Sequence, residues 1–289
     1  PSVVMIAGFM VVMAALQKTR LISNVKSAMV SLVNKGSYRS YGLLLVIVML
    51  GASLAGTGAT GYYVLILSLV STIPYSKKLP TSKLMMPLGF ATNHPLLPIN
   101  LALLFGVTAT VLETAGFHQE ISMGRFALVN LIMSAAFLAW SLIAYRFLPD
   151  HPIADASEDA LAGTGFTAMV GDAVAGVLGS GVSPFVFIVA FALLTSTCAT
   201  FTGSNMGSVY IFAPIAIAAC TSLGLNPTAA AIAVVISGWN GGYMPIDGMP
   251  AMILGMGKYK LPEFWVFSVP MYLIRILALC AGAVFIFPM

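Results

Sequence analysis

Two stretches of the sequence place an asparagine five residues before a proline and end on a carboxamide or a carboxylate. They are residues 93–100 (N-x4-P-I-N) and residues 240–247 (N-x4-P-I-D). Proline removes a backbone N–H and breaks a helix, which leaves free carbonyls beside the side-chain oxygens. Broken helices of this kind bind sodium through such oxygens in transporters. The candidate ion- and substrate-binding residues here are Asn93, Pro98, Asn100, Asn240, Pro245 and Asp247.

Glycine-rich stretches precede both asparagines, GTGATG at residues 56–61 and TGSNMG at residues 202–207. Glycine tolerates positive φ, so a tight tip can turn its carbonyls toward one ion. A helix that starts after such a tip presents free N–H groups, which favour a carboxylate or an oxyanion. The candidate residues of the tips are Thr57, Gly58, Thr60, Ser204 and Asn205. The sodium ligands predicted from tips and breaks together are Thr57, Asn93, Ser204, Asn205 and Asn240.

Neither break contains a Lys or an Arg in the sequence, so an anionic substrate is expected to rely on helix dipoles and on a bound cation. Substrate affinity then depends on the ion, which is the physical basis of symport. Gly56, Gly58 and Gly203 have an alternative role in close helix packing, and Ser204-Asn205 has one as an interhelical hydrogen-bond pair. His94 is expected to be a hydrogen-bonded packing residue, while Asp247 is either functional or paired with Lys258.

The tips and breaks repeat along the chain. A shift of 147 residues brings seven identities over residues 53–100, and they fall mainly on helix breakers and small polar residues. Gly56 meets Gly203, Asn93 meets Asn240, and Asn100 meets Asp247. Interrupted segments at corresponding positions of two halves are the best pointer in a sequence to the binding site of a transporter.

The composition indicates which elements must hold these residues. The chain has 289 residues, of which 59% are hydrophobic and only 8% are charged, against about 25% charged in soluble domains. We therefore expect an all-α integral membrane protein. Four apolar segments are interrupted and two are unbroken, at residues 126–147 and 264–287. The interrupted segments are residues 43–73, 83–112, 184–223 and 229–256.

Three regions complete the expected organisation. The first repeat is residues 1–148, and it includes a span at 3–16 and an amphipathic surface helix at 22–34. Residues 149–162 form a polar cytoplasmic linker, and residues 163–289 form the second repeat, which begins with a weakly apolar span at 163–182. This topology places eleven of the thirteen Lys and Arg residues inside. The two hairpins then enter from opposite faces, as an inverted repeat.

The segments LLTSTCATFTGSNMGSVYIFAPIAIAACTSLGLNP and GGYMPIDGMPAMILGMGKYKLPEFW resemble a re-entrant hairpin and the following broken helix of the divalent anion:sodium symporter (DASS) family, in the ion transporter superfamily. LPTSKLMMPLGFATNHPLLPIN resembles the broken helix of the first half of that family. The Ser-Asn-Thr tip of the family is matched by Ser204-Asn205, with Met206 in place of Thr, whereas the first tip reads Thr57-Gly58-Ala59. The resemblance implies two re-entrant hairpins, two broken helices and sodium-coupled transport of an anion.

The leading hypothesis is thus a secondary active transporter of a small dicarboxylate, tricarboxylate or sulfate, coupled to sodium by alternating access. The alternatives are a cation:proton antiporter of the same superfamily that uses Asp247, and a non-transporting fragment. An enzyme is not expected, because no H-E-x-x-H or G-x-S-x-G motif occurs and the residues before Asp172 lack the G-x-G-D pattern. The expected location is the inner or plasma membrane, with a possible homodimer, no organic cofactor and no nucleic-acid partner. The start at Pro1 suggests a longer polypeptide.

Overall fold

The computed structural model describes residues 27, 29–33, 35–56, 59–71, 73, 77–118, 120–151, 183–246 and 248–289. Within these ranges the secondary structure is helical, without strands. The helices of the first half are α3 (Tyr38–Ala55), α4 (Thr60–Ser71), α5 (Thr81–Ala91), the 3₁₀ helix η1 (Pro98–Asn100), α6 (Ala102–Thr114) and α7 (Met123–Ala144). Those of the second half are α9 (Pro184–Thr202), α10 (Asn205–Ser222), α11 (Thr228–Ser237), α12 (Gly248–Gly257) and α13 (Leu261–Ile286).

All four helix interruptions predicted from the sequence are confirmed. α3 ends before Gly56, whose φ is 91°, and α9 ends before Gly203, whose φ is 66°. Both backbone conformations favour glycine, because a Cβ atom would strain them. The other two interruptions separate α5 from α6 and α11 from α12. We call residues 92–101 the first break and residues 238–247 the second break.

Five helices of the described residues are long and apolar enough to cross a membrane, namely α3, α7, α9, α10 and α13. Each has at least 18 residues, close to the length that spans the hydrocarbon core of a bilayer. α4, α6, α11 and α12 are apolar but shorter, because a tip or a break ends each of them. These features are those of a multi-pass membrane protein.

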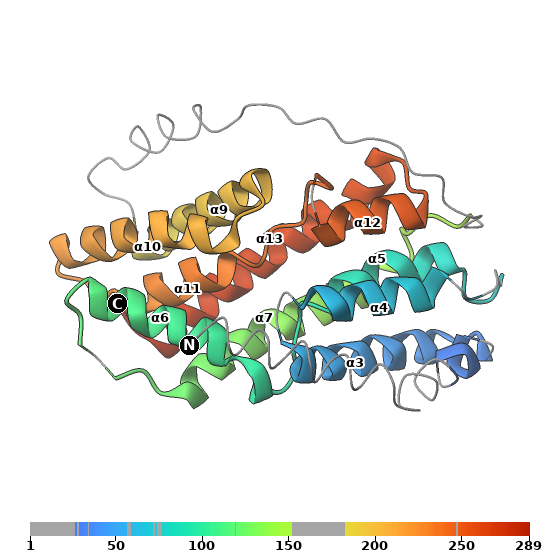
Figure 1. Ribbon diagram of the computed structural model, residues 1–289, viewed down its shortest axis with the longest axis horizontal. Coiled ribbons are helices and arrows are strands. Elements are labelled where there is room, and N and C mark those ends of the chain that lie inside the picture. Colours follow the sequence, from blue (N-terminus) through green and yellow to red (C-terminus); the bar gives the residue numbers. More distant parts are fainter. Residues whose placement is uncertain are drawn as a thin grey trace.

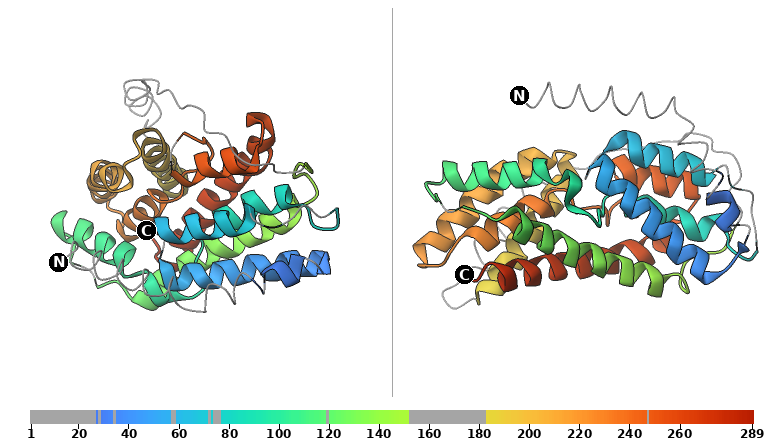
Figure 2. Two further views of the ribbon diagram at one scale, coloured as in Figure 1. Left: turned by 45° about the vertical axis from the view of Figure 1, so that its right-hand side comes forward. Right: turned by 90° about the horizontal axis from the view of Figure 1, so that it is seen from below.

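The helices pack around two hydrophobic cores that lie at opposite ends of the long axis (Figure 1). The α9 core contains residues of α6, α9, α10 and α11, and the α3 core contains residues of α3, α4, α5 and α12. α7 and α13 lie side by side and run through both cores (Figure 2). They are antiparallel, since Phe126 at the start of α7 and Phe287 after α13 share the α9 core.

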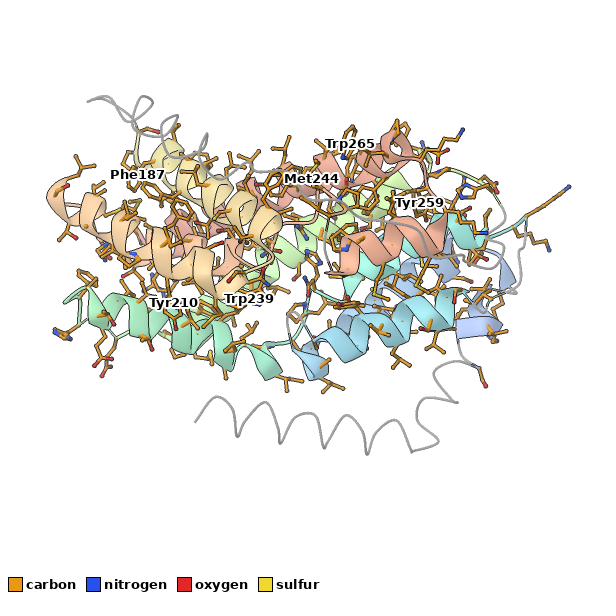
Figure 3. The ribbon with its side chains drawn as sticks, turned by 45° about the horizontal axis from the view of Figure 1, so that its top comes forward. Phe187, Tyr210, Trp239, Met244, Tyr259 and Trp265 are labelled. Carbon is orange, nitrogen blue, oxygen red and sulfur yellow. The ribbon has the colours of Figure 1, made fainter. Side chains whose placement is uncertain are left out.

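Each broken helix is divided between the two cores. α5 packs in the α3 core and its continuation α6 in the α9 core, whereas α11 packs in the α9 core and α12 in the α3 core. The two breaks therefore lie where the cores meet. Trp239 of the second break accordingly lies near the middle of the molecule (Figure 3), between Phe187 on the side of the α9 core and Tyr259 on the other side.

The connection between α12 and α13 is anchored to the start of α5. The Tyr259 hydroxyl donates a hydrogen bond to the Ser82 carbonyl, and the Ser82 hydroxyl accepts one from the His151 backbone N–H at 3.0 Å. Burial raises the pKa of Tyr259 well above its ordinary value, so its hydroxyl stays protonated and remains a donor. The Tyr259 bond thus ties the connection between α12 and α13 to α5, and the His151 bond ties the segment after α7 to the same residue.

Several expectations concern residues outside the described ranges. They are the span at 3–16, most of the linker at 149–162, the crossing at 163–182, and the residues Thr57, Gly58, Asp172 and Asp247. Of the predicted surface helix at 22–34, residues 29–33 are helical. Met29 and Val33 are buried in the α3 core, so that face of the helix packs against protein.

Candidate functional site

A cavity of about 270 Å³ lies where the second tip and the two breaks meet. Its lining comes from helices, a tip and breaks of both halves of the sequence. The lining residues are Tyr63 of α4, Phe90 of α5, Asn93 of the first break, Ala199 and Thr200 of α9, Gly203 and Asn205 of the second tip, Gly238, Trp239, Gly241 and Gly242 of the second break, Gly248, Met249 and Pro250 of α12, and Arg275 of α13. Carboxamides, glycine backbone and one guanidinium group thus surround a single space.

The first break is held by neutral donors and acceptors. The Ser53 hydroxyl near the end of α3 accepts hydrogen bonds from the backbone N–H groups of Leu96 and Leu97, each at 2.9 Å. The carbonyl of Pro95 accepts from the Asn130 amide at 3.3 Å and from the Ser134 hydroxyl at 2.9 Å, both on α7. α3 and α7 thereby satisfy the backbone groups that the break frees, as an apolar environment requires.

The second break is held by a cation. Nη2 of Arg275 donates hydrogen bonds to the carbonyls of Asn240 at 2.6 Å and Gly241 at 2.7 Å. Nη1 of Arg275 donates to Nε2 of His94 at 2.9 Å. Because arginine is only a donor, Nε2 of His94 must be the acceptor, and the imidazole is neutral with its proton on Nδ1. That proton is donated to the Phe90 carbonyl at 2.7 Å, so one chain of hydrogen bonds links α13, both breaks and α5.

The glycines of the second break allow a close approach of the backbone to the second hairpin. A Cβ atom at Gly241 would lie 2.1 Å from the Thr200 hydroxyl oxygen and 3.3 Å from the Ser196 carbonyl oxygen, both on α9. A Cβ atom at Gly238 would lie 2.5 Å from a methyl carbon of Val209 on α10. Close packing against α9 and α10 is therefore the role of these two glycines of the second break.

Gly241→Ala is expected to destabilise the protein by about 1–3 kcal/mol, because the buried Thr200 side chain or the break itself has to move. The measurement is the thermal unfolding of the purified protein in detergent. Gly255→Ala is the matched control, since it is a helical glycine in α12 whose added Cβ meets nothing within 4 Å. Equal unfolding temperatures for the two variants would contradict the close approach.

Two of the predicted site residues line the cavity, Asn93 and Asn205. The Asn93 amide also donates to the Trp239 carbonyl at 3.4 Å, which connects the first break to the second. Asn205 is the first residue of α10, so it lies at the end of the helix where N–H groups are free. These two residues supply neutral oxygens of the kind that sodium binds.

The other predicted residues have different positions. The exposed Ser204 caps α10, since its hydroxyl oxygen accepts from the Gly207 N–H at 3.2 Å. The Asn240 side chain turns back on α11 and donates to the Ile236 carbonyl at 2.7 Å, and neither Pro98 nor Pro245 lines the cavity. Thr60 begins α4 and Asn100 ends η1, but their side chains lie outside what the structure describes, as do the residues Thr57, Gly58 and Asp247.

One expectation from the sequence is wrong. The absence of Lys and Arg from the two breaks suggested a site without a fixed cation, whereas Arg275 reaches the second break from α13. The sequence contained a signal for it, because Arg275 interrupts a long apolar segment and an ionisable residue inside a span is a functional hypothesis by default. His94 is the hydrogen-bonded packing residue that was predicted, and its ring stacks on Phe137 at 3.9 Å between centroids.

Comparisons of the chain with family models, with curated proteins and with solved structures find no match. The function is inferred from the cavity and its lining alone. The cavity combines a positive group with neutral oxygens and free N–H groups, which is an arrangement that can bind an anion and a hard cation together.

Proposed function

We propose that this protein is a secondary active transporter of a small divalent anion, of the dicarboxylate, tricarboxylate or sulfate class, driven by sodium. The observation that carries the proposal is the shared cavity, in which a hairpin tip, two helix breaks and a buried arginine meet. In transporters, discontinuous helices direct free N–H groups at anionic substrates and carbonyls at cations. Asn205 at the start of α10 and Arg275 supply positive potential, and Asn93 and Asn205 supply oxygens.

The arrangement of the two halves supports an inverted repeat. α3 to α7 and α9 to α13 follow the same order, which is a pair of helices, a broken helix and a long helix. Corresponding elements occupy opposite cores, since α4 and α5 lie in the α3 core while α10 and α11 lie in the α9 core. The long helices α7 and α13 are antiparallel, as an inverted repeat requires. Alternating access would then result from movement of one core relative to the other around the cavity.

Uptake into proteoliposomes that contain the full chain tests the proposal. The panel comprises labelled succinate, citrate and sulfate, each with an inward sodium gradient and with choline in place of sodium. We expect saturable uptake of at least one divalent anion that the sodium gradient accelerates. Absence of uptake for the whole panel under both conditions would refute the transport of divalent anions. Cation flux driven by a proton gradient would instead favour the antiporter that uses Asp247.

A further inference from the structure

We propose that Arg275 is a built-in cation of the second break, which occupies the place of a coupling ion there and supplies a fixed positive charge to the anion site. The proposal deepens the proposed function and rests on it for the identity of the anion. Its structural part, that a guanidinium group replaces a free ion at the carbonyls of the second break, can be tested without transport.

The position of Arg275 shows that its side chain is not solvated as that of a surface arginine is. It is the fifteenth of the 26 residues of α13, about 21 Å along the helix from its start. Its side chain is 1% exposed and lines the cavity. Removing a guanidinium group from water costs several kcal/mol unless its environment compensates the charge. A cation at this depth therefore needs a negative partner or a function.

The negative partners of Arg275 are backbone carbonyls. Within the described part of the chain no carboxylate contacts its guanidinium group, which instead donates to the carbonyls of Asn240 and Gly241 and to His94. Both carbonyls follow the last turn of α11, where the helix dipole is negative. Unwound carbonyls at the C-terminal end of a half-helix are the groups that coordinate sodium in broken-helix transporters. Arg275 therefore occupies the place of an ion.

His94 extends this arrangement to the first broken helix. Its Nδ1–H group donates to the carbonyl of Phe90, in the last turn of α5, and its Nε2 accepts from Arg275. The C-terminal ends of α5 and α11 thus both direct negative potential toward one guanidinium group, directly or through a neutral imidazole. The cation distinguishes the backbone of the two breaks among the described residues: the Pro95 carbonyl of the first break accepts from neutral donors of α7, Asn130 and Ser134, whereas two carbonyls of the second break accept from Arg275.

The hydrogen bonds of Arg275 are also incomplete. Its Nε atom is buried without a partner among the described residues, although Nη1 and Nη2 are bonded. The described partners of the guanidinium group are neutral and do not cancel its positive charge, and arginine is not deprotonated in proteins. The cavity that Arg275 lines is therefore electropositive on this side. An anionic substrate gains from that charge even before a sodium ion binds.

The test is chemical rescue of Arg275→Ala by guanidinium chloride, measured as the thermal unfolding temperature of the purified full chain in detergent. The alanine variant leaves two unpaired carbonyls and a space of the size of a guanidinium ion. Millimolar guanidinium chloride, far below denaturing concentrations, is expected to raise the unfolding temperature of this variant by several degrees. Choline chloride at the same concentration controls for ionic strength.

Arg125→Ala is the matched control, since Arg125 is exposed at the start of α7 with its guanidinium carbon 4.4 Å from the centre of the Phe287 ring. Neither this variant nor the unmodified protein should gain stability from guanidinium. If Arg275→Ala responds as weakly as they do, the proposal is overturned. If Arg275→Ala cannot be purified folded, Arg275→Met is tested in the same way, because its apolar side chain fills part of the space and leaves the carbonyls unpaired.

Uptake assays separate this proposal from the proposed function. Arg275→Ala is expected to lower anion uptake by roughly 10-fold or more, with partial recovery in guanidinium. Rescue of stability in a protein that takes up no anion would support the built-in cation and refute the transport of divalent anions. Uptake in the unmodified protein without rescue of stability in either Arg275 variant would leave the transport function standing and refute the built-in cation.

Discussion

If the cavity is the transport site, Asn205→Ala raises the sodium concentration that gives half-maximal uptake by roughly 5–150-fold. The anion concentration that gives half-maximal uptake rises with it. Asn205 lines the cavity at the start of α10, so removal of its carboxamide is expected to leave bound ions with one oxygen fewer. A lost buried hydrogen-bonding partner costs about 1–3 kcal/mol, and the two affinities fall together because the binding events are coupled. The measurement is initial uptake against sodium concentration at several concentrations of the anion.

Asn226→Ala is the control for that experiment. Asn226 lies in the turn between α10 and α11, where its side-chain oxygen accepts from the Thr228 N–H at 3.0 Å, and it does not line the cavity. Its removal should lower stability without changing either half-saturation concentration. An unchanged sodium dependence in Asn205→Ala would assign the second tip to packing alone.

Ser53→Ala has the largest expected effect on stability, about 2–4 kcal/mol. The Ser53 side chain is fully buried and accepts hydrogen bonds from two consecutive N–H groups of the first break. Alanine leaves both N–H groups without their acceptor, in surroundings where apolar side chains or lipid cannot replace it. The measurement is the free energy of unfolding of the reconstituted protein in denaturant.

Ser71→Ala supplies the comparison for Ser53→Ala. The Ser71 hydroxyl is exposed at the end of α4 and donates to the Ser68 carbonyl at 2.8 Å. Its loss should change the free energy of unfolding by less than about 0.5 kcal/mol. A change in Ser53→Ala as small as in Ser71→Ala would mean that the first break holds its conformation without α3.

Local sequence features predicted the interruptions of the helices, because glycine and proline act on the backbone within a turn or two. Gly56 and Gly203 end α3 and α9 by adopting positive φ, and this requirement is visible in a single residue. The unbroken spans were equally predictable, since α7 and α13 follow from apolar length alone. The repeat predicted that both tips and both breaks meet, and the second tip and the two breaks do line one cavity, whereas Thr57 and Gly58 of the first tip lie outside the described residues.

The chemistry of the second break could not be predicted from its own residues. Asn240 was expected to direct its side chain toward an ion, but the carboxamide bonds to its own helix and the backbone carbonyl faces the cation. That choice depends on Arg275, which lies 35 residues later on another helix and reaches the break only after α13 has packed. Rotamers and long-range partners of this kind are decided by tertiary packing, which no local pattern encodes.

The exchange of half-helices between the two cores has a consequence for how the polypeptide is assembled. The α3 core is incomplete until α12 has been synthesised, and α6 has no core to join until α9, α10 and α11 have followed it. During synthesis the apolar surfaces of the first half that later pack against the second half are therefore expected to contact lipid. Neither half contains all the helices of a hydrophobic core, so the two halves are expected to fold together, each contributing a half-helix to the core of the other.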